Sequence, residues 1–280
     1  MKQAHTLRIG NSVLDLSTPV VMGILNTTPD SFFTGSRTSL SDIVSRASNM
    51  LEEGAIMLDV GGYSTRPGAV EISVEEECLR VIPAIEAIKK EFPTCIISVD
   101  SFRAAVAQKA MDVGAEIVND VSGGDADVDM FPLVANSKTP YICMHSRGNP
   151  QTMQQLTQYE NLLAEIIEYF RARLERLEQA GLYDVVLDPG FGFAKTIDQN
   201  FELLRNLGAL TLIGKPILAG LSRKSMIWKT LGTSADEALH GTTALHMLAL
   251  QQGVSILRVH DVRPAVETIT LWKKACLPEL

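Results

Sequence analysis

One pattern recurs along this 280-residue sequence: a short apolar run, a polar residue at its end, a loop, and then a helical stretch. Apolar runs of this length bounded by turn residues are typical of buried strands. Strands that alternate with helical segments are typical of parallel sheets. The sequence predicts strands over residues 20–25, 56–60, 95–99, 116–118, 140–144, 185–187, 216–219 and 254–257.

The number of these units favours a closed barrel. Eight consecutive strand–helix units in a chain of this length are typical of the TIM (β/α)8 barrel, an α/β fold of about 250 residues. An open doubly wound sheet is the alternative, but no G-x-G-x-x-G fingerprint opens the first helix. Residues 7–16 predict a short N-terminal β-hairpin with a Gly-Asn turn that caps one end. Because no linker or low-complexity tract interrupts the pattern, we expect one domain over residues 1–280.

Helical stretches fill the spaces between the predicted strands. Ser73 is a candidate N-cap, and Glu76 three residues later completes the pattern of a capping box. Gly181 is a stop signal for the longest helix. The predicted helices cover residues 40–53, 74–90, 104–113, 129–136, 159–180, 200–207, 235–252 and 262–275. A further helix is predicted before 235–252, with a kink or break near residue 232.

Charge and composition argue against several classes of protein. The chain has 33 acidic and 25 basic side chains and a formal net charge of −8, which disfavours nucleic-acid binding. Its N-terminus lacks the apolar stretch of a signal peptide. No window approaches the roughly 20 apolar residues of a membrane-spanning helix. Cys78, Cys95, Cys143 and Cys276 lie far apart and form no C-x-x-C pair, so we expect reduced thiols in a cytoplasmic protein.

The ends of the predicted strands carry most of the chemistry. TIM-barrel active sites lie at the C-terminal ends of the strands. A single Asp or Asn there often only marks a turn, but polar residues at nearly every strand end predict one shared polar site. In chain order these ends supply Asn26, Asp59, Asp100, Asn119, His145, Asp188, the Ser222-Arg223-Lys224 turn, and Arg258 with His260.

The mixture of side chains indicates a flat, nitrogen-rich ring and a phosphate group as ligands. Asp100, Asn119 and Asp188 offer acceptors for the N–H groups of a pterin-like or guanine-like ring, since carboxylates form strong paired bonds with an amidine-like edge. Lys224 can donate to such a ring, and Arg258 can stack on it. Asn26 can hold Mg²⁺ through its side-chain oxygen. Phe193 with Phe32 and Pro67 can enclose a second, aromatic substrate. A separate group of cationic and hydroxylic side chains suits a diphosphate. The diphosphate set is Thr65, Arg66, Arg258 and His260.

Four stretches together resemble the dihydropteroate synthase family, the folate-pathway transferases that sulfonamides inhibit. They are Asn-Thr-Thr-Pro-Asp-Ser-Phe at 26–32, Ser-Thr-Arg-Pro-Gly at 64–68, Leu-Asp-Pro-Gly-Phe-Gly-Phe at 187–193 and Ser-Arg-Lys-Ser at 222–225. The closing Arg-Val-His-Asp at 258–261 also fits the family. The resemblance covers essentially the whole chain.

The resemblance implies a role for each matching position. It implies that 6-hydroxymethyl-7,8-dihydropterin diphosphate is joined to p-aminobenzoate, with Mg²⁺ as cofactor held at Asn26, and that the enzyme is a homodimer. The implied pterin-binding residues are Asp100, Asn119, Met144, Asp188, Gly220, Lys224 and Arg258. The implied diphosphate-binding residues are Asn26, Thr65, Arg66, Arg258 and His260, and those for p-aminobenzoate are Phe32, Thr65, Arg66, Pro67, Phe193, Lys224 and Ser225. The implied catalytic set is Asp100, Asp188, Lys224, Arg258 and His260.

The chain departs from the family pattern at three places. Phe-Thr-Gly-Ser at 33–36 stands where Ser-Asp-Gly-Gly is common, so one loop carboxylate is missing. Tyr63 stands where many relatives have glutamate. Arg103 occupies a position where lysine is frequent. These changes concern the loops rather than the predicted pterin pocket.

The residues predict a dissociative substitution, because acids surround the site where cationic charge would develop and bases surround the leaving group. Two other classes of function remain alternatives. A pterin-binding methyltransferase domain would share the barrel and the acidic pocket, but its methyl-tetrahydrofolate ligand has no diphosphate. A non-catalytic or weakly active barrel would bind folate-like ligands or a partner enzyme, and release of diphosphate distinguishes an enzyme from such a binder.

Overall fold

The computed structural model describes residues 5–27, 37–64 and 70–276. Eight parallel strands form one sheet in the order β8-β7-β6-β5-β4-β3-β10-β9. Each strand pairs with the strand of the preceding or following unit, as the predicted barrel requires. The strands are β3 (Val20–Asn26), β4 (Met57–Gly61), β5 (Ile96–Asp100), β6 (Ile117–Asp120), β7 (Tyr141–Met144), β8 (Val185–Asp188), β9 (Leu218–Ala219) and β10 (Ile256–Val259).

The two ends of this sheet meet between β8 and the residues just before β9. Leu187 and Ile217 form a parallel bridge there, and the Leu187 amide donates to the Pro216 carbonyl at 2.9 Å. Strand β9 is shorter than the predicted 216–219, because a proline has no N–H to donate to a ladder. The predicted TIM barrel is confirmed, with each predicted strand lying within two residues of an observed one.

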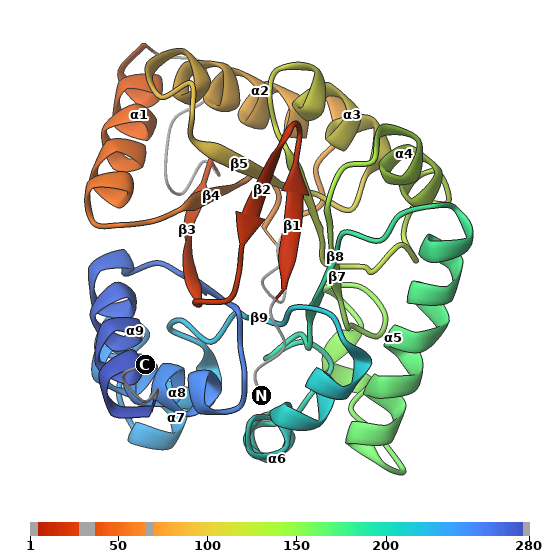
Figure 1. Cartoon of the computed structure of the whole chain (residues 1–280), viewed down its shortest axis with the longest axis vertical. Helices are drawn as coiled ribbons and strands as arrows, with labels where there is room; N and C mark the ends of the chain where they lie inside the picture. Colours follow the sequence, from red (N-terminus) through yellow and green to blue (C-terminus); the bar gives the residue numbers. More distant parts are fainter. Residues whose placement is uncertain (1–4, 28–36, 65–69, 277–280) are drawn as a thin grey trace.

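The helices form an outer ring around the barrel (Figure 1). The helices that follow the strands are α1 (Arg37–Glu52), α2 (Val74–Glu91), α3 (Ala104–Asp112), α4 (Met130–Ser137), α5 (Leu162–Gln179), α6 (Ile197–Arg205), α7 (Ser225–Leu231), α8 (Leu239–Gln251) and α9 (Val262–Cys276). Two short 3-10 helices, η1 (Met153–Gln155) and η2 (Leu207–Ile213), lie in the connections.

The N-terminal hairpin closes the end of the barrel where the strands begin. Its strands β1 (Thr6–Ile9) and β2 (Ser12–Asp15) pair antiparallel, and Figure 1 shows them lying across the barrel. Leu7, Ile9 and Leu16 are buried against side chains from the starts of the barrel strands. The hairpin was predicted to cap one end, and its position leaves the opposite end, where the strands finish, for a site.

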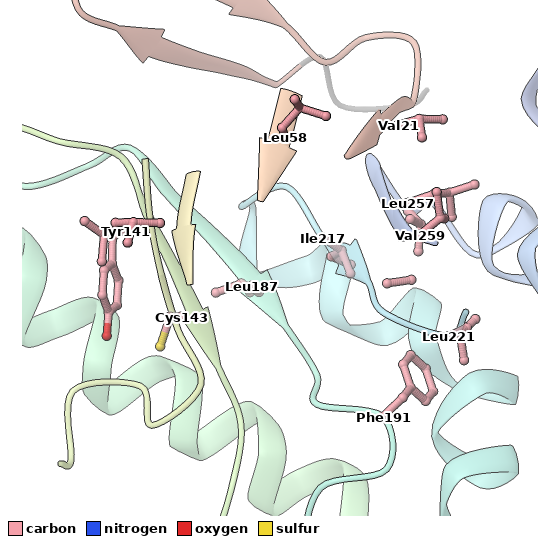
Figure 2. Close-up of a cluster of buried hydrophobic side chains, with 14 of the residues drawn as sticks. Val21, Leu58, Tyr141, Cys143, Leu187, Phe191, Ile217, Leu221, Leu257 and Val259 are labelled. Atoms are coloured by element: carbon pink, nitrogen blue, oxygen red, sulfur yellow. The ribbon is translucent and has the colours of Figure 1, made fainter. Parts of the chain in front are cut away.

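A second and larger apolar core lies between the barrel and its helices. Tyr141, Leu187 and Leu257 point from the strands into this layer, and Phe191 and Leu221 join it from loops (Figure 2). Side chains on successive strand residues face opposite sides. The residues that alternate with this layer therefore face the barrel interior, among them Asp59, which is fully buried.

The helix starts show one wrong detail and one missed feature. Ser73 caps α2 by accepting from the Glu76 amide at 3.1 Å, but the predicted capping box is incomplete because the Glu76 carboxylate forms an ion pair with Arg80 at 2.5 Å. A complete capping box occurs instead at Thr196 and Gln199. It starts α6 at Ile197, three residues before the predicted start.

The four cysteines are free thiols, of which Cys78, Cys95 and Cys143 are buried and Cys276 is exposed. Within residues 5–27, 37–64 and 70–276, no helix has the length and apolar character needed to cross a membrane.

Candidate active site

The polar strand ends surround one cavity at the end of the barrel opposite the hairpin. The cavity contains about 410 Å³ of empty space, part of it open to solvent. Side chains from six strand ends and their loops line it, which no single segment of the sequence could provide. The lining residues are Asp100, Asn119, Val121, Met144, Asp188, Gly190, Phe191, Phe193, Gly220, Lys224 and Arg258.

Arg258 on β10 joins two carboxylates on one side of this cavity. Its Nε donates to Asp59 Oδ2 at 2.5 Å, and its Nη2 donates to Asp100 Oδ2 at 2.5 Å. Asn119 Nδ2 donates to the same Asp59 oxygen at 2.9 Å. Asp59 therefore orients both Arg258 and Asn119 from the barrel interior. It is not among the described residues that line the cavity.

Burial shifts the protonation of these groups. It raises the pKa of Asp100 to about 7, and the Arg258 guanidinium opposes this shift. Burial alone would lower the pKa of Arg258, but Asp59 and Asp100 reverse this and raise its pKa. Arg258 is therefore a permanent cation, whereas Asp100 can exchange a proton with a ligand near neutral pH.

Asp188 ends β8 on the other side of the cavity and is 6% exposed. Its Oδ1 accepts from the Gly190 amide at 2.8 Å, which fixes the carboxylate. Burial raises the pKa of Asp188, and the Gly190 hydrogen bond and Lys224 oppose that shift. Gly190 has φ of 68°, and a Cβ there would lie 2.0 Å from the His145 carbonyl oxygen. Only glycine fits this turn.

Lys224 reaches the cavity from the start of α7. Its Nζ lies 4.4 Å from the centre of the Phe193 ring. Burial lowers the pKa of Lys224 to about 8, with Asp188 opposing the shift. The cavity wall thus combines the carboxyl groups of Asp100 and Asp188 with the two cations Arg258 and Lys224, and Asp59 adds a third carboxylate beneath Arg258. Three acids against two cations favour a ligand carrying or developing positive charge.

The turn that presents Lys224 is held by its neighbour Arg223. Arg223 has φ of 55°, a left-handed conformation that costs a non-glycine residue about 1–2 kcal/mol. Its guanidinium donates to Asp261 through Nε at 2.9 Å and Nη2 at 2.7 Å. This paired contact connects the β9–α7 turn to the residue directly before α9 and offsets the backbone strain.

Substitutions at Arg223 should therefore reverse the usual order of glycine and alanine. Both changes remove the Asp261 contact, but glycine adopts a positive φ without strain. We expect Arg223→Ala to lower the free energy of unfolding by about 1 kcal/mol more than Arg223→Gly does. Urea titration measures this difference, and an alanine variant as stable as the glycine variant would contradict the assigned strain.

The predicted site residues divide into three groups. Asp100, Asn119, Met144, Asp188, Gly220, Lys224, Arg258 and Phe193 line the cavity together. Asn26, Ser225 and His260 belong to the same end of the barrel but lie outside the described lining. His260 is an exposed residue whose ring Nδ1 lies in a partly buried contact, 3.1 Å from Ser222 Oγ. Phe32, Thr65, Arg66 and Pro67 lie outside the described residues, as do residues 33–36.

Sequence reasoning missed several members of this site. Val121, Gly190 and Phe191 also line the cavity. Gly190 and Phe191 belong to the predicted turn after Asp188, so their position in the motif was a usable signal. His145 was predicted as one of the polar strand ends, and it is buried with Nδ1 at 2.9 Å from Lys195 Nζ.

A metal is the remaining implied component of the site. Across the described ranges, no group of three or more His, Cys, Asp or Glu side chains is arranged to hold a metal ion. Asn26 is half-buried at the end of β3 and offers one amide oxygen. Such a donor fits Mg²⁺, an ion that prefers oxygen ligands and is commonly bound through substrate phosphates with few protein ligands.

Comparison with known proteins shows which family has this arrangement. The model of the pterin-binding enzyme family matches residues 22–260. The dihydropteroate synthase of Escherichia coli K12 is 45% identical over 259 residues, which cover 91% of each chain. The chain belongs to the dihydropteroate synthase family. The members of this family are transferases, and the resemblance predicted from the four motifs is confirmed.

Two solved structures of the family have the same fold as this chain. The Xanthomonas albilineans dihydropteroate synthase with 4-aminobenzoic acid has a TM-score of 0.91 and 37% identity, and the match covers 100% of both chains. The Yersinia pestis dihydropteroate synthase in a sulfonamide drug complex has a TM-score of 0.90 and 38% identity, covering 96% of this chain and 98% of that one.

Two of the departures from the family pattern contact each other. The Arg103 guanidinium lies 5.2 Å from the ring centres of both Tyr63 and Phe102. It also donates to Glu77 at 2.9 Å and to the Ile72 carbonyl at 2.7 Å. Tyr63 and Arg103 therefore form a cation–π contact in this chain.

Proposed function

We propose that this member of the dihydropteroate synthase family joins 6-hydroxymethyl-7,8-dihydropterin diphosphate to p-aminobenzoate and releases diphosphate. The observation that carries the proposal is the single cavity in which Asp100, Asn119, Asp188 and Lys224 converge. Three carboxyl or amide side chains and one ammonium match the alternating donors and acceptors at the edge of a pterin ring. The cavity opens to solvent at the ends of the strands, so a flat ring can enter it from that side.

The charge distribution supports a dissociative substitution. Departure of diphosphate leaves positive charge on the pterin methylene group, and that charge is shared with the ring. The carboxylates of Asp100 and Asp188 stabilise this cation, and preorganised charge of this kind is usually the largest catalytic contribution. The amine of p-aminobenzoate then forms the new C–N bond and loses a proton to solvent.

The leaving diphosphate requires positive charge at the rim of the barrel. Arg258 supplies a permanent cation on one side of the cavity. His260 follows two residues later, but partial burial and the nearby Arg258 lower its pKa to about 4, so its neutral ring contributes a hydrogen bond rather than a charge. Thr65 and Arg66 are assigned to the same group from the sequence. Asn26 would hold Mg²⁺, which when bound neutralises charge on the diphosphate oxygens.

The second substrate is assigned to the side of the cavity formed by Phe193 and Lys224. The Phe193 ring is half-buried, so one part of it is available for stacking on an aromatic amine. Lys224 Nζ, 4.4 Å from the Phe193 ring centre, can pair with the carboxylate of p-aminobenzoate. Ser225, Phe32 and Pro67 are assigned to this substrate from the sequence.

A pterin-binding methyltransferase domain is the second candidate, because it would use the same acidic pocket. The Ser-Thr-Arg-Pro-Gly stretch at 64–68 favours the synthase, since a methyl-tetrahydrofolate ligand has no diphosphate to bind. The relatives that carry the synthase name at 45% identity favour it as well.

A product assay tests the proposed reaction. The purified chain is given both substrates and Mg²⁺, and dihydropteroate and diphosphate are quantified. We expect equal amounts of the two products, and we expect Arg66→Ala to lower kcat/KM by about 100-fold through loss of diphosphate stabilisation. Arg8→Ala is the matched control, because Arg8 is exposed on the hairpin at the other end of the barrel. Absence of both products with wild-type chain would refute the synthase assignment.

The proposed working form is a cytoplasmic homodimer. Free buried thiols such as Cys95 and Cys143 suit a reducing compartment. Leu231 on α7 and Leu248 on α8 are 56% and 47% exposed, so this side of the barrel offers apolar contacts to a second copy. Light scattering at the mass of one chain would refute the dimer.

A further inference from the structure

A buried lysine lies beneath the loop that forms one wall of the cavity. Lys195 precedes α6 and is 4% exposed. It was not among the predicted site residues, and it does not line the cavity in the described structure. An ammonium group is rarely buried unless all its hydrogen-bonding capacity is satisfied, so its surroundings indicate what it holds in place.

The Lys195 ammonium has three acceptors for its three protons. Its Nζ lies 2.9 Å from His145 Nδ1, 3.1 Å from the Gly190 carbonyl oxygen and 3.0 Å from the Phe193 carbonyl oxygen. Two of these acceptors are backbone carbonyls of the loop after β8. The loop therefore wraps around the end of its own lysine.

The His145 ring is arranged to accept from this lysine. Burial and the nearby Lys195 lower the pKa of His145 well below its usual value, so the imidazole is neutral and one ring nitrogen is free to accept. The ring packs edge-on against Tyr169, with ring centres 4.6 Å apart. This packing restricts the rotation that would carry Nδ1 away from Lys195.

The same loop controls two elements of the binding cavity. The Gly190 amide orients the Asp188 carboxylate, and the side chains of Phe191 and Phe193 line the cavity wall. Ala194 has φ of 48°, a strained conformation that neighbouring contacts must hold. Its carbonyl accepts from Tyr159 Oη at 2.9 Å. The carbonyls of residues 190, 193 and 194 are thus all held by side-chain hydrogen bonds, the first two from Lys195 and the third from Tyr159.

We propose that Lys195 and His145 form a buried positioning pair that sets the conformation of residues 190–194, and through them the orientation of Asp188 and Phe193 toward the pterin. Neither residue touches the substrate. The effect on pterin binding rests on the function proposed above, but the effect on the loop does not. The contacts require one donor group with three partners, so a side chain of similar size without donors cannot replace Lys195.

The pair keeps its contacts in both protonation states of the lysine. Burial lowers the pKa of Lys195 to about 7, Asp188 opposes this shift, and Lys224 and Arg147 add to it. The neutral amine still has two N–H groups for the two carbonyls. Its lone pair then accepts from the other tautomer of His145. We therefore expect the loop to remain in place as pH rises through 7.

Amide hydrogen exchange tests the loop without any ligand. In Lys195→Met, the carbonyls of Gly190 and Phe193 lose their common donor, and we expect the Gly190 amide to exchange at least about 10-fold faster because the loop opens more often. Strand amides such as that of Val118 should exchange as in the wild type. Unchanged exchange at Gly190 in a folded Lys195→Met chain would overturn the proposal, whatever the chain binds.

Two substitutions of His145 separate positioning from general stability. His145→Phe keeps an aromatic ring but removes the acceptor, whereas His145→Gln supplies an amide oxygen as acceptor. At pH 6, where Lys195 is mainly protonated, we expect His145→Phe and Lys195→Met each to weaken binding of 6-hydroxymethyl-7,8-dihydropterin about 10-fold by calorimetry, a loss of roughly 1.4 kcal/mol. His145→Gln should retain affinity within about 2-fold of the wild type.

A stability control completes the design. Met57→Ala removes a buried side chain at the hairpin end of the barrel and should lower stability by about 2–5 kcal/mol without changing pterin affinity. Equal losses of affinity in Met57→Ala and Lys195→Met would show that Lys195 and His145 affect binding only through the overall stability of the fold, and would overturn the proposal. Failure of the wild-type chain to bind the pterin would instead refute the proposed function, while the exchange experiment still decides the role of the pair.

Discussion

Replacing Asp188 with asparagine is expected to weaken binding of 6-hydroxymethyl-7,8-dihydropterin by about 100-fold, measured by calorimetry. The carboxylate is buried at the end of β8, and its Oδ1 is already held by the Gly190 amide at 2.8 Å. The charged oxygen that remains can form a charge-assisted bond to the ring, worth about 1.5–3 kcal/mol. Asparagine is similar in size but lacks the charge, and its amide group can place an N–H against a ring donor.

Asp184→Asn is the matched control for this experiment. Asp184 is also an aspartate next to β8, but its Oδ1 accepts from the Arg8 amide at 3.0 Å at the hairpin end of the barrel. We expect the control to bind the pterin as the wild type does. If Asp188→Asn binds the pterin with unchanged affinity, Asp188 has no part in recognition and the pocket assignment is wrong.

Replacing Arg258 with methionine is expected to affect both stability and turnover. Arg258 joins Asp59, which is fully buried, to Asp100, with both distances at 2.5 Å. Removing the cation leaves the neighbouring carboxylates of Asp59 and Asp100 unpaired. Breaking a buried ion pair in this way lowers the free energy of unfolding by about 3–5 kcal/mol. In turnover assays, loss of one preorganised group that stabilises the leaving diphosphate should lower kcat by about 100-fold to 1000-fold.

A second substitution separates the two effects of Arg258. Asp59→Asn removes the charge that the methionine variant leaves unpaired, so the double variant should be more stable than the sum of the single changes predicts. Urea titration measures this coupling. Activity should not recover in the double variant, because the leaving group still lacks its cation. Recovery of both stability and activity would show that Arg258 acts only by neutralising Asp59.

Much of the fold followed from local patterns. Buried strands of a parallel sheet are continuous apolar runs, which is why the runs that end at Asn26, Asp100 and Asp188 were identified within two residues of their observed bounds. The Ser73 cap and the Gly181 stop signal were also confirmed, since Ser73 accepts from the Glu76 amide and Gly181 follows α5 with φ of 85°. The start of α6 was misplaced because Thr196 and Gln199 form a capping box that precedes the apolar pattern.

The binding cavity was predictable because barrel topology brings strand ends together. Asp100, Asn119, Asp188 and Lys224 are separated by up to 124 positions in the sequence and line one cavity. Supporting residues gave weaker signals. Asp59 was predicted only as one of the polar strand ends, because its contacts with Arg258 and Asn119 depend on distances across the barrel.

Lys195 could not be identified from its sequence context. A lysine between Ala194 and Thr196 resembles an ordinary solvated residue before a helix. Its burial depends on the turn at Gly190, which folds the loop back over the side chain. The role of Arg103 was equally hidden, because its partners Tyr63 and Glu77 come from two different segments.

A crystal structure of the chain with 6-hydroxymethyl-7,8-dihydropterin would test the central claim most directly. We expect the pterin ring in the cavity at the ends of the strands, with ring N–H groups within about 3.2 Å of the carboxylate of Asp188 and with Asn119 and Lys224 also in contact. A ring bound elsewhere, with this cavity empty, would contradict the account.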